Sequence, residues 1–178
     1  MSTGLVVWLT GLPGAGKTTI ASLLAAALAA RGDAVTHLDG DRVRAEAPRT
    51  IGFTKADRDA NVARVAAEAA EVAARGEIAV VSLISPYAQA RADARAAVQA
   101  VGRFVEIHVA TPLDECIRRD PKGLYARALN GELSDFTGVS APYEAPQAPD
   151  LRLDTSGATP AESCAAVLSL LGSPASRP

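Results

Sequence analysis

The segment Gly11-Leu-Pro-Gly-Ala-Gly16-Lys17-Thr18 decides the fold of this chain. It matches the pattern G-x-x-x-x-G-K-[ST], in which glycines let backbone N–H groups converge on phosphate oxygens. An apolar run at 5–9 precedes it, and an Ala- and Leu-rich stretch with helical spacing follows at 18–31. A strand, a glycine-rich turn and a helix in this order predict a P-loop, a turn that binds nucleotide phosphates at the helix N-terminus.

Two side chains of this loop have distinct expected tasks. Lys17 should reach the β- and γ-phosphates of ATP, so we also expect it to act in catalysis. The Thr18 hydroxyl should bind Mg²⁺. The residues expected to bind ATP are Gly11, Pro13, Gly14, Ala15, Gly16, Lys17, Thr18 and Thr19.

Strand and helix patterns alternate along the rest of the chain. The expected strands are 34–38, 78–83, 104–109 and 151–153, and the expected helices are 55–75, 88–101, 112–119 and 159–171. Such alternation predicts an α/β fold with a mostly parallel sheet and helices on both faces, a three-layer sandwich like that of P-loop NTPases. Ligands bind such sheets at the carboxyl ends of the strands.

Length and composition favour one globular domain. The chain has 178 residues, of which 48% are hydrophobic and 21% charged, and we expect residues 1–172 to form the domain. A net charge of −2 offers no broad basic surface, so we expect neither nucleic acid nor a membrane as a partner. Cys116 and Cys164 lack metal-ligand spacing, and no secretory signal pattern is present, which favours the cytoplasm.

Residues 120–149 interrupt the alternation. They show little periodicity and are rich in Gly, Pro, Tyr and charge. A long irregular segment inside a compact domain is typical of a functional loop, and we expect a mobile lid here. The tail at 173–178 is expected to be disordered.

Two aspartates follow the second expected strand. Asp39-Gly40-Asp41, with Arg44 close behind, should lie beside the P-loop. One carboxylate can hold a Mg²⁺-bound water while the other accepts a proton from an attacking hydroxyl. The alternative is a structural aspartate turn that caps a helix.

Two further groups are candidates for a substrate site. Arg58, Asn61 and Arg64 recur every three residues on an expected helix, and arginine is suited to recognising phosphate or sulfate oxygens. A solvated helix face would give the same pattern. Ser85-Pro-Tyr87 closes the third strand, where it can line a pocket or simply form a turn.

The ordered set of these strings resembles the adenylylsulfate kinase family. The resemblance runs from Val6 to about Thr155. The strings that carry it are Leu38-Asp-Gly-Asp41 with Arg44, Gly52-Phe53, Arg58 with Asn61 and Arg64, Ile84-Ser-Pro-Tyr87, Arg119-Asp-Pro-Lys-Gly-Leu-Tyr125, Phe136-Thr-Gly138 and Pro142-Tyr-Glu144.

The resemblance implies a reaction: ATP and adenosine 5′-phosphosulfate give ADP and 3′-phosphoadenosine 5′-phosphosulfate. It further implies that Asp41 is the base, that Asp39 supports Mg²⁺, that Lys122 is a catalytic lid lysine, and that the protein is a homodimer. The residues that it implies for the adenylylsulfate are Asp41, Arg44, Phe53, Arg58, Asn61, Ile84, Ser85, Lys122 and Phe136. Of these, Phe136 would stack on the adenine.

Some positions depart from the family pattern, and two other functions stay open. Residues 45–50 replace the usual Gly-Leu-Asn element at unchanged spacing, and Asp135 stands where glycine is usual. The altered loop leaves open a kinase of the same fold that acts on another nucleotide or hydroxyl metabolite. The second alternative is a domain that senses nucleotide without turnover.

Overall fold

The computed structural model of this chain describes residues 4–45 and 52–172, with the side chain of Arg44 left out. Five strands form one parallel sheet in the order β2-β3-β1-β4-β5. Their bounds are β1 Leu5–Thr10, β2 Val35–Asp39, β3 Ile78–Ser82, β4 Arg103–Val109 and β5 Leu151–Leu153. The predicted α/β fold with a parallel sheet is therefore confirmed.

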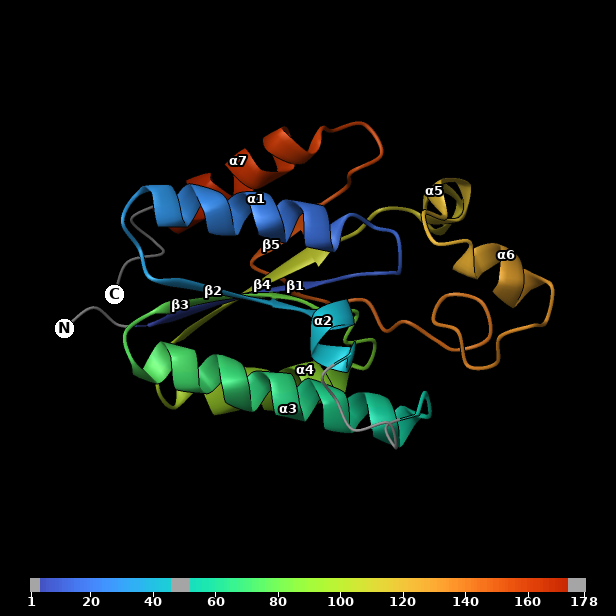
Figure 1. Ribbon diagram of the computed structural model, residues 1–178, viewed down its shortest axis with the longest axis horizontal. Helices are drawn as coiled ribbons and strands as arrows, with labels where there is room; N and C mark the ends of the chain where they lie inside the picture. The colour runs from blue at the N-terminus through green and yellow to red at the C-terminus, as the bar shows by residue number, and fades with distance from the viewer. Residues whose placement is uncertain (1–3, 46–51, 173–178) are drawn as a thin grey trace.

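Seven helices accompany the sheet in the described residues. Their bounds are α1 Lys17–Ala30, α2 Gly40–Ala45, α3 Lys55–Ala74, α4 Ala88–Gln99, α5 Leu113–Arg119, α6 Leu124–Leu129 and α7 Pro160–Gly172. Figure 1 shows α1 and α7 on one face of the sheet and α3 and α4 on the other. None of these helices is long and apolar enough to span a membrane.

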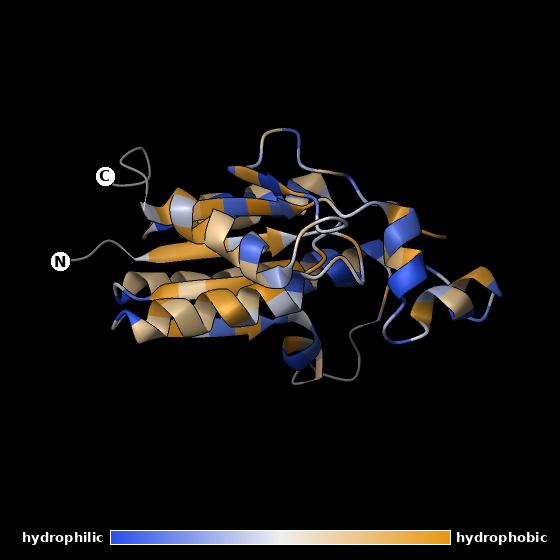
Figure 2. Cartoon of the chain, turned by 90° about the horizontal axis from the view of Figure 1, so that it is seen from above, coloured by the Kyte–Doolittle hydropathy of each residue, from blue (hydrophilic) through white to orange (hydrophobic). Residues whose placement is uncertain are grey.

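The central strand β1 divides the core into two halves. Val6 and Trp8 face the cluster that includes α3 and α4, while Val7 and Leu9 face the cluster that includes α1 and α7. Alternate side chains of a strand point to opposite faces, so a strand buried on both faces is apolar throughout. Figure 2 shows the resulting hydrophobic interior between the helices and the sheet.

Two helices differ from the sequence prediction. Helix α2 follows β2 directly, and α6 lies inside the segment 120–149 that was expected to be irregular. Each has six residues, fewer than two helical turns, so neither sequence shows a clear period. Gly40 lets α2 begin close to β3, because a Cβ there would lie 3.0 Å from the Ser82 carbonyl oxygen.

The segment from α5 to β5 lies beyond the carboxyl ends of the strands. Figure 1 shows α5, α6 and the loop after them beyond the end of the sheet at which the arrowhead of β4 lies. The P-loop and α2 lie at this same end. The predicted tail at 173–178, and residues 46–50 of the altered loop, fall outside the described residues.

Candidate active site

The P-loop connects β1 to α1. Gly16 has a φ of 103°, a conformation that favours glycine, and it precedes the first helical residue, Lys17. The carbonyl oxygen of Ala15 accepts hydrogen bonds from Thr111 Oγ1 at 2.9 Å and Thr155 Oγ1 at 3.1 Å. These hydroxyls follow β4 and β5, so the loop is held by the neighbouring strand ends.

Lys17 lies folded against the P-loop. Its Nζ donates to the carbonyl oxygens of Gly11 at 2.9 Å and Leu12 at 2.7 Å, and the residue is only 8% exposed. Burial lowers the pKa of Lys17 to about 8, although the negative charges of Asp41 and Asp39 oppose part of that shift. An anionic phosphate at this position would favour the charged ammonium.

Asp39 forms a hydrogen-bonded centre with two hydroxyls. Its Oδ2 accepts from Thr18 Oγ1 at 2.7 Å and from Ser82 Oγ at 2.9 Å, while Oδ1 accepts from the Asp41 backbone N–H at 3.1 Å. Burial alone would raise the pKa of Asp39, but the hydrogen bonds from Thr18, Ser82 and the backbone outweigh it and lower that pKa. The carboxylate is therefore held in its charged form.

The oxygen donors beside the P-loop fit Mg²⁺ carried by a nucleotide. Thr18 and Asp39 offer a hydroxyl and a carboxylate, and Mg²⁺ typically takes one or two such groups together with water and phosphate oxygens. Over residues 4–45 and 52–172, no three His, Cys, Asp or Glu side chains gather into a metal cluster.

Asp41 meets Lys122 at the mouth of the site. Asp41 lies in the first turn of α2 and Lys122 in the connection between α5 and α6, and their side chains form an ion pair. Both side chains are exposed, by 71% for Asp41 and 56% for Lys122. The expected role of Asp41 as the base stays a prediction.

The predicted substrate residues on α3 are buried. Arg58 is 9% exposed and Asn61 5% exposed, so the alternative of a solvated helix face is wrong for these two. Arg58 donates through Nε to the Phe53 carbonyl oxygen at 2.9 Å and through a terminal nitrogen to Thr137 Oγ1 at 2.8 Å, and it also bonds the Asp135 carbonyl oxygen. Its guanidinium thus joins the start of α3 to the segment after α6.

The two predicted aromatic contacts occupy different surroundings. Phe53 is 59% exposed, whereas Phe136 packs edge-to-face against Tyr125 with ring centroids 5.1 Å apart. Tyr125 in turn donates its hydroxyl to the Pro13 carbonyl oxygen at 2.8 Å. The segment after α6 therefore reaches the P-loop through Tyr125. Adenine stacking by Phe136 stays a prediction.

Ile84 and Ser85 lie at the carboxyl end of β3 in a constrained turn. Ser85 has a φ of 41°, in the left-handed region that non-glycine residues rarely adopt. Its Oγ accepts from Trp8 Nε1 at 3.0 Å, and Thr10 Oγ1 donates to the Ile84 carbonyl oxygen at 2.6 Å. These long-range contacts hold the turn against β1, and its expected contact with substrate stays a prediction.

Several predicted residues meet in one place. The electrostatic environment of the Lys17 ammonium includes Asp39, Asp41 and Lys122. The side chain of Arg44 is not described, so its proposed contact with substrate stays a prediction. Sequence reasoning missed Thr111 and Arg91, because a lone threonine or helical arginine carries no motif.

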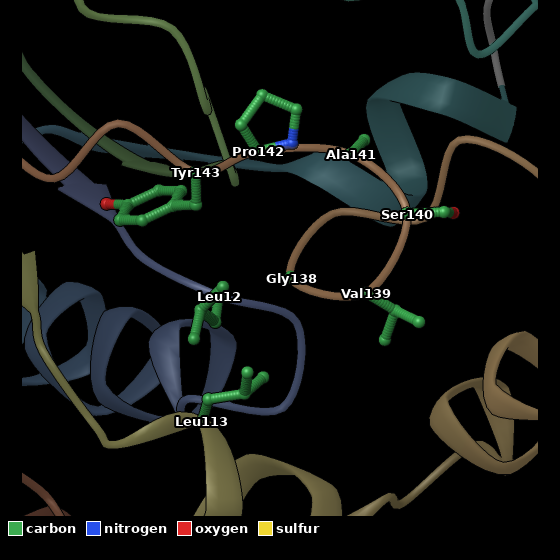
Figure 3. Close-up of a pocket in the computed structure, with 8 residues that line it drawn as sticks. All are labelled: Leu12, Leu113, Gly138, Val139, Ser140, Ala141, Pro142 and Tyr143. Carbon is green, nitrogen blue, oxygen red and sulfur yellow. The ribbon is translucent and has the colours of Figure 1, made fainter.

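A separate cavity of about 520 Å³ lies beside the P-loop. The residues that line it are Leu12, Leu113, Gly138, Val139, Ser140, Ala141, Pro142 and Tyr143. Figure 3 shows Leu12 and Leu113 on one side and the loop 138–143 on the other. None of the site residues predicted from the sequence lines this cavity.

Known proteins are similar to this chain in both sequence and fold. Residues 3–154 match the family described as adenylylsulphate kinase. An adenylyl-sulfate kinase of Halothermothrix orenii is 47% identical over 168 residues, which are 94% of this chain and 89% of that protein. The Mycobacterium tuberculosis APS kinase CysC, solved with AMPPNP and APS, superposes with a TM-score of 0.93 at 41% identity, covering 97% of this chain and all of that one.

Some longer relatives contain a region that is similar to this chain. The bifunctional enzyme NodQ of Rhizobium sp. strain N33 is 54% identical over 152 residues, or 85% of this chain. The matched region spans 23% of that enzyme. The chain therefore covers about a quarter of the length of such relatives.

Proposed function

Because this chain belongs to the adenylylsulphate kinase family, we propose that it transfers the γ-phosphoryl group of ATP to the ribose 3′-hydroxyl of adenosine 5′-phosphosulfate. The products are ADP and 3′-phosphoadenosine 5′-phosphosulfate. The observation that carries the proposal is the meeting of Asp41 and Lys122, 81 residues apart in sequence, beside Lys17.

The donor side of the reaction belongs to the P-loop. Lys17 would leave the carbonyl oxygens of Gly11 and Leu12 to contact the β- and γ-phosphates, which keeps its ammonium protonated. Thr18 and Asp39 would hold Mg²⁺, directly or through water. That ion supplies charge neutralisation between the phosphates.

The acceptor side begins at Asp41. Its carboxylate takes the proton of the 3′-hydroxyl as the oxygen attacks the γ-phosphorus, and the bond from that phosphorus to the bridging β–γ oxygen breaks. The electron pair leaves with ADP. Lys122 would exchange its ion pair with Asp41 for the charge that develops on the transferred group.

The assembly and the location of the protein are also proposals. We propose that the protein is a homodimer. We also propose that it is located in the cytoplasm, in agreement with its two free cysteines. Light scattering on the purified protein gives the mass directly. A mass of one chain at all concentrations would refute the dimer.

The proposed activity is tested by product identification. Purified protein is incubated with MgATP and adenosine 5′-phosphosulfate, and mass spectrometry should find the acceptor enlarged by one phosphoryl group. The matched control is 3′-deoxyadenosine 5′-phosphosulfate, which lacks the acceptor hydroxyl and should give no such product.

Three outcomes separate the candidate functions. Product from adenosine 5′-phosphosulfate but not from the 3′-deoxy analogue supports the proposal. Turnover with other hydroxyl acceptors alone would favour a kinase of the same fold with another substrate. ATP binding without turnover of any acceptor would favour a nucleotide-sensing domain.

A further inference from the structure

Arg91 is a buried arginine that belongs to none of the predicted site motifs. It lies in the first turns of α4 and its side chain is only 4% exposed. Its guanidinium bonds three parts of the fold: the Ser85 carbonyl oxygen at 2.7 Å, the Glu144 carbonyl oxygen at 2.6 Å, and Glu106 Oε1 in β4 at 3.2 Å. A planar group with several fixed donors suits such a three-way junction, whereas an ammonium is a single point.

The first of these bonds reaches a strained residue. Ser85 keeps a φ of 41°, which costs free energy and persists only where the surroundings enforce it. Two bonds do so: Arg91, six residues along the chain, donates to the carbonyl oxygen, and Trp8 Nε1, in β1, donates to the side-chain oxygen. Ser85 and its neighbour Ile84 are among the residues expected to contact the acceptor.

The second bond reaches the end of the lid segment. Glu144 is further fixed by its own N–H, which donates to the Pro86 carbonyl oxygen at 2.8 Å, and by its Oε2, which accepts from the Ala88 N–H at 2.7 Å. The adjacent Tyr143 hydroxyl lies 3.0 Å from Thr10 Oγ1. The segment that follows the lid is thus hydrogen-bonded to residues 84–86, which we call the acceptor loop.

A neighbouring arginine shows what a purely structural role looks like. Arg95 lies one turn along α4, contacts the same Glu106 at 3.4 Å and reaches Asp150, and its side chain is 30% exposed. The bonds described for Arg95 involve neither Ser85 nor Glu144. Arg91 therefore differs from Arg95 by its two backbone carbonyl partners, not by its ion pair.

We propose that Arg91 is a positioning residue that joins the acceptor loop at Ser85 to the returning lid segment at Glu144 and so sets the geometry of acceptor binding. The proposal rests on the proposed function, because the acceptor is the nucleotide bound beside Ser85. It assigns Arg91 no contact with the reacting atoms. Loss of the junction should weaken the acceptor site and leave the P-loop unchanged.

The test compares Arg91→Lys with Arg95→Lys. Both retain a positive charge near Glu106, but Arg91→Lys cannot bond three partners in different directions. We expect the KM for adenosine 5′-phosphosulfate to rise about 10- to 100-fold in Arg91→Lys, since small displacements of positioning groups have effects of this size. The KM for ATP should stay at the parent value, and Arg95→Lys should change neither constant.

A second measurement needs no substrate. Trp8 is the single tryptophan of the sequence, and its indole N–H bonds Ser85, so its fluorescence reports on the acceptor loop. The emission should change in Arg91→Lys and not in Arg95→Lys. This reading remains valid if the parent protein fails to phosphorylate adenosine 5′-phosphosulfate, an outcome that refutes the proposed function alone.

Two results would count against the proposed role of Arg91. Equal rises in both KM values, or parent values of KM and Trp8 emission in folded Arg91→Lys, would overturn the proposal. Should Arg91→Lys fail to fold, Arg91→Gln replaces it, because its single amide group cannot bond Ser85, Glu144 and Glu106 together. A rise confined to the acceptor KM supports the junction, and an unchanged acceptor KM refutes it.

Discussion

The P-loop and the lid segment build their halves of the site from contacts of very different range in the sequence. Lys17 bonds Gly11 and Leu12, which are six and five residues away, respectively. The lid segment depends on distant partners, since Lys122 pairs with Asp41 and Thr137 accepts from Arg58 across 79 residues. The bonds of the Lys17 ammonium are therefore local in the sequence, although Thr111 and Thr155 also hold the P-loop from distant strand ends. The contacts of the lid segment form only when the whole chain has folded.

This contrast predicts the largest effect at the point where the two halves meet. Asp41→Asn removes the proposed base but keeps the size of the side chain, so kcat should fall by about 10²- to 10⁴-fold. ATP affinity, measured by equilibrium titration, should change little because the P-loop contacts remain. Asp93→Asn, an exposed acid on α4, is the matched control and should be neutral. A rate near that of the parent would contradict the base assignment.

Removal of the P-loop ammonium should have the next largest effect. Lys17→Ala withdraws the charge proposed for the β- and γ-phosphates, and loss of one such group costs about 10²- to 10³-fold in kcat. Steady-state kinetics at saturating ATP gives the value. Near-parent turnover would show that Lys17 stays on the Gly11 and Leu12 carbonyl oxygens throughout the reaction.

A change on the acceptor side should act on one substrate only. Arg58→Lys loses the forked bonds to Phe53, Thr137 and Asp135, so the KM for the acceptor should rise about tenfold, while the KM for ATP stays constant. Proteolysis within 120–149 should also become faster. The control is Arg75→Lys, at the far end of α3. Equal effects on both substrates would show that the two halves are not independent.

The smallest expected effect is a proton taken up when ATP binds. Burial holds the pKa of Lys17 at about 8, and bound phosphates should raise it. Uptake by Lys17 should therefore approach about 0.9 protons at pH 9 and fall to about 0.1 at pH 7. Calorimetry in buffers of different ionisation enthalpy measures this difference. Equal uptake at both pH values would contradict a deprotonated Lys17 above pH 8.

The same contrast explains what the sequence could predict. Local sequence patterns were enough to predict the P-loop, the alternation of strands and helices, and the position of Asp39 and Asp41 beside the P-loop. Helices α2 and α6 were missed because six residues hold too little periodicity. The bonds of Arg58 to Thr137 and of Arg91 to Glu144 depend on folded geometry that no local pattern encodes.

A crystal structure with MgAMPPNP and adenosine 5′-phosphosulfate tests the central claim most directly. The account predicts that Lys17 Nζ has moved from the carbonyl oxygens of Gly11 and Leu12 to the β- and γ-phosphates. It also predicts that an Asp41 carboxylate oxygen lies within about 2.6–3.2 Å of the ribose 3′-hydroxyl. A 3′-hydroxyl that points away from Asp41, with Lys17 still on the loop, would contradict it.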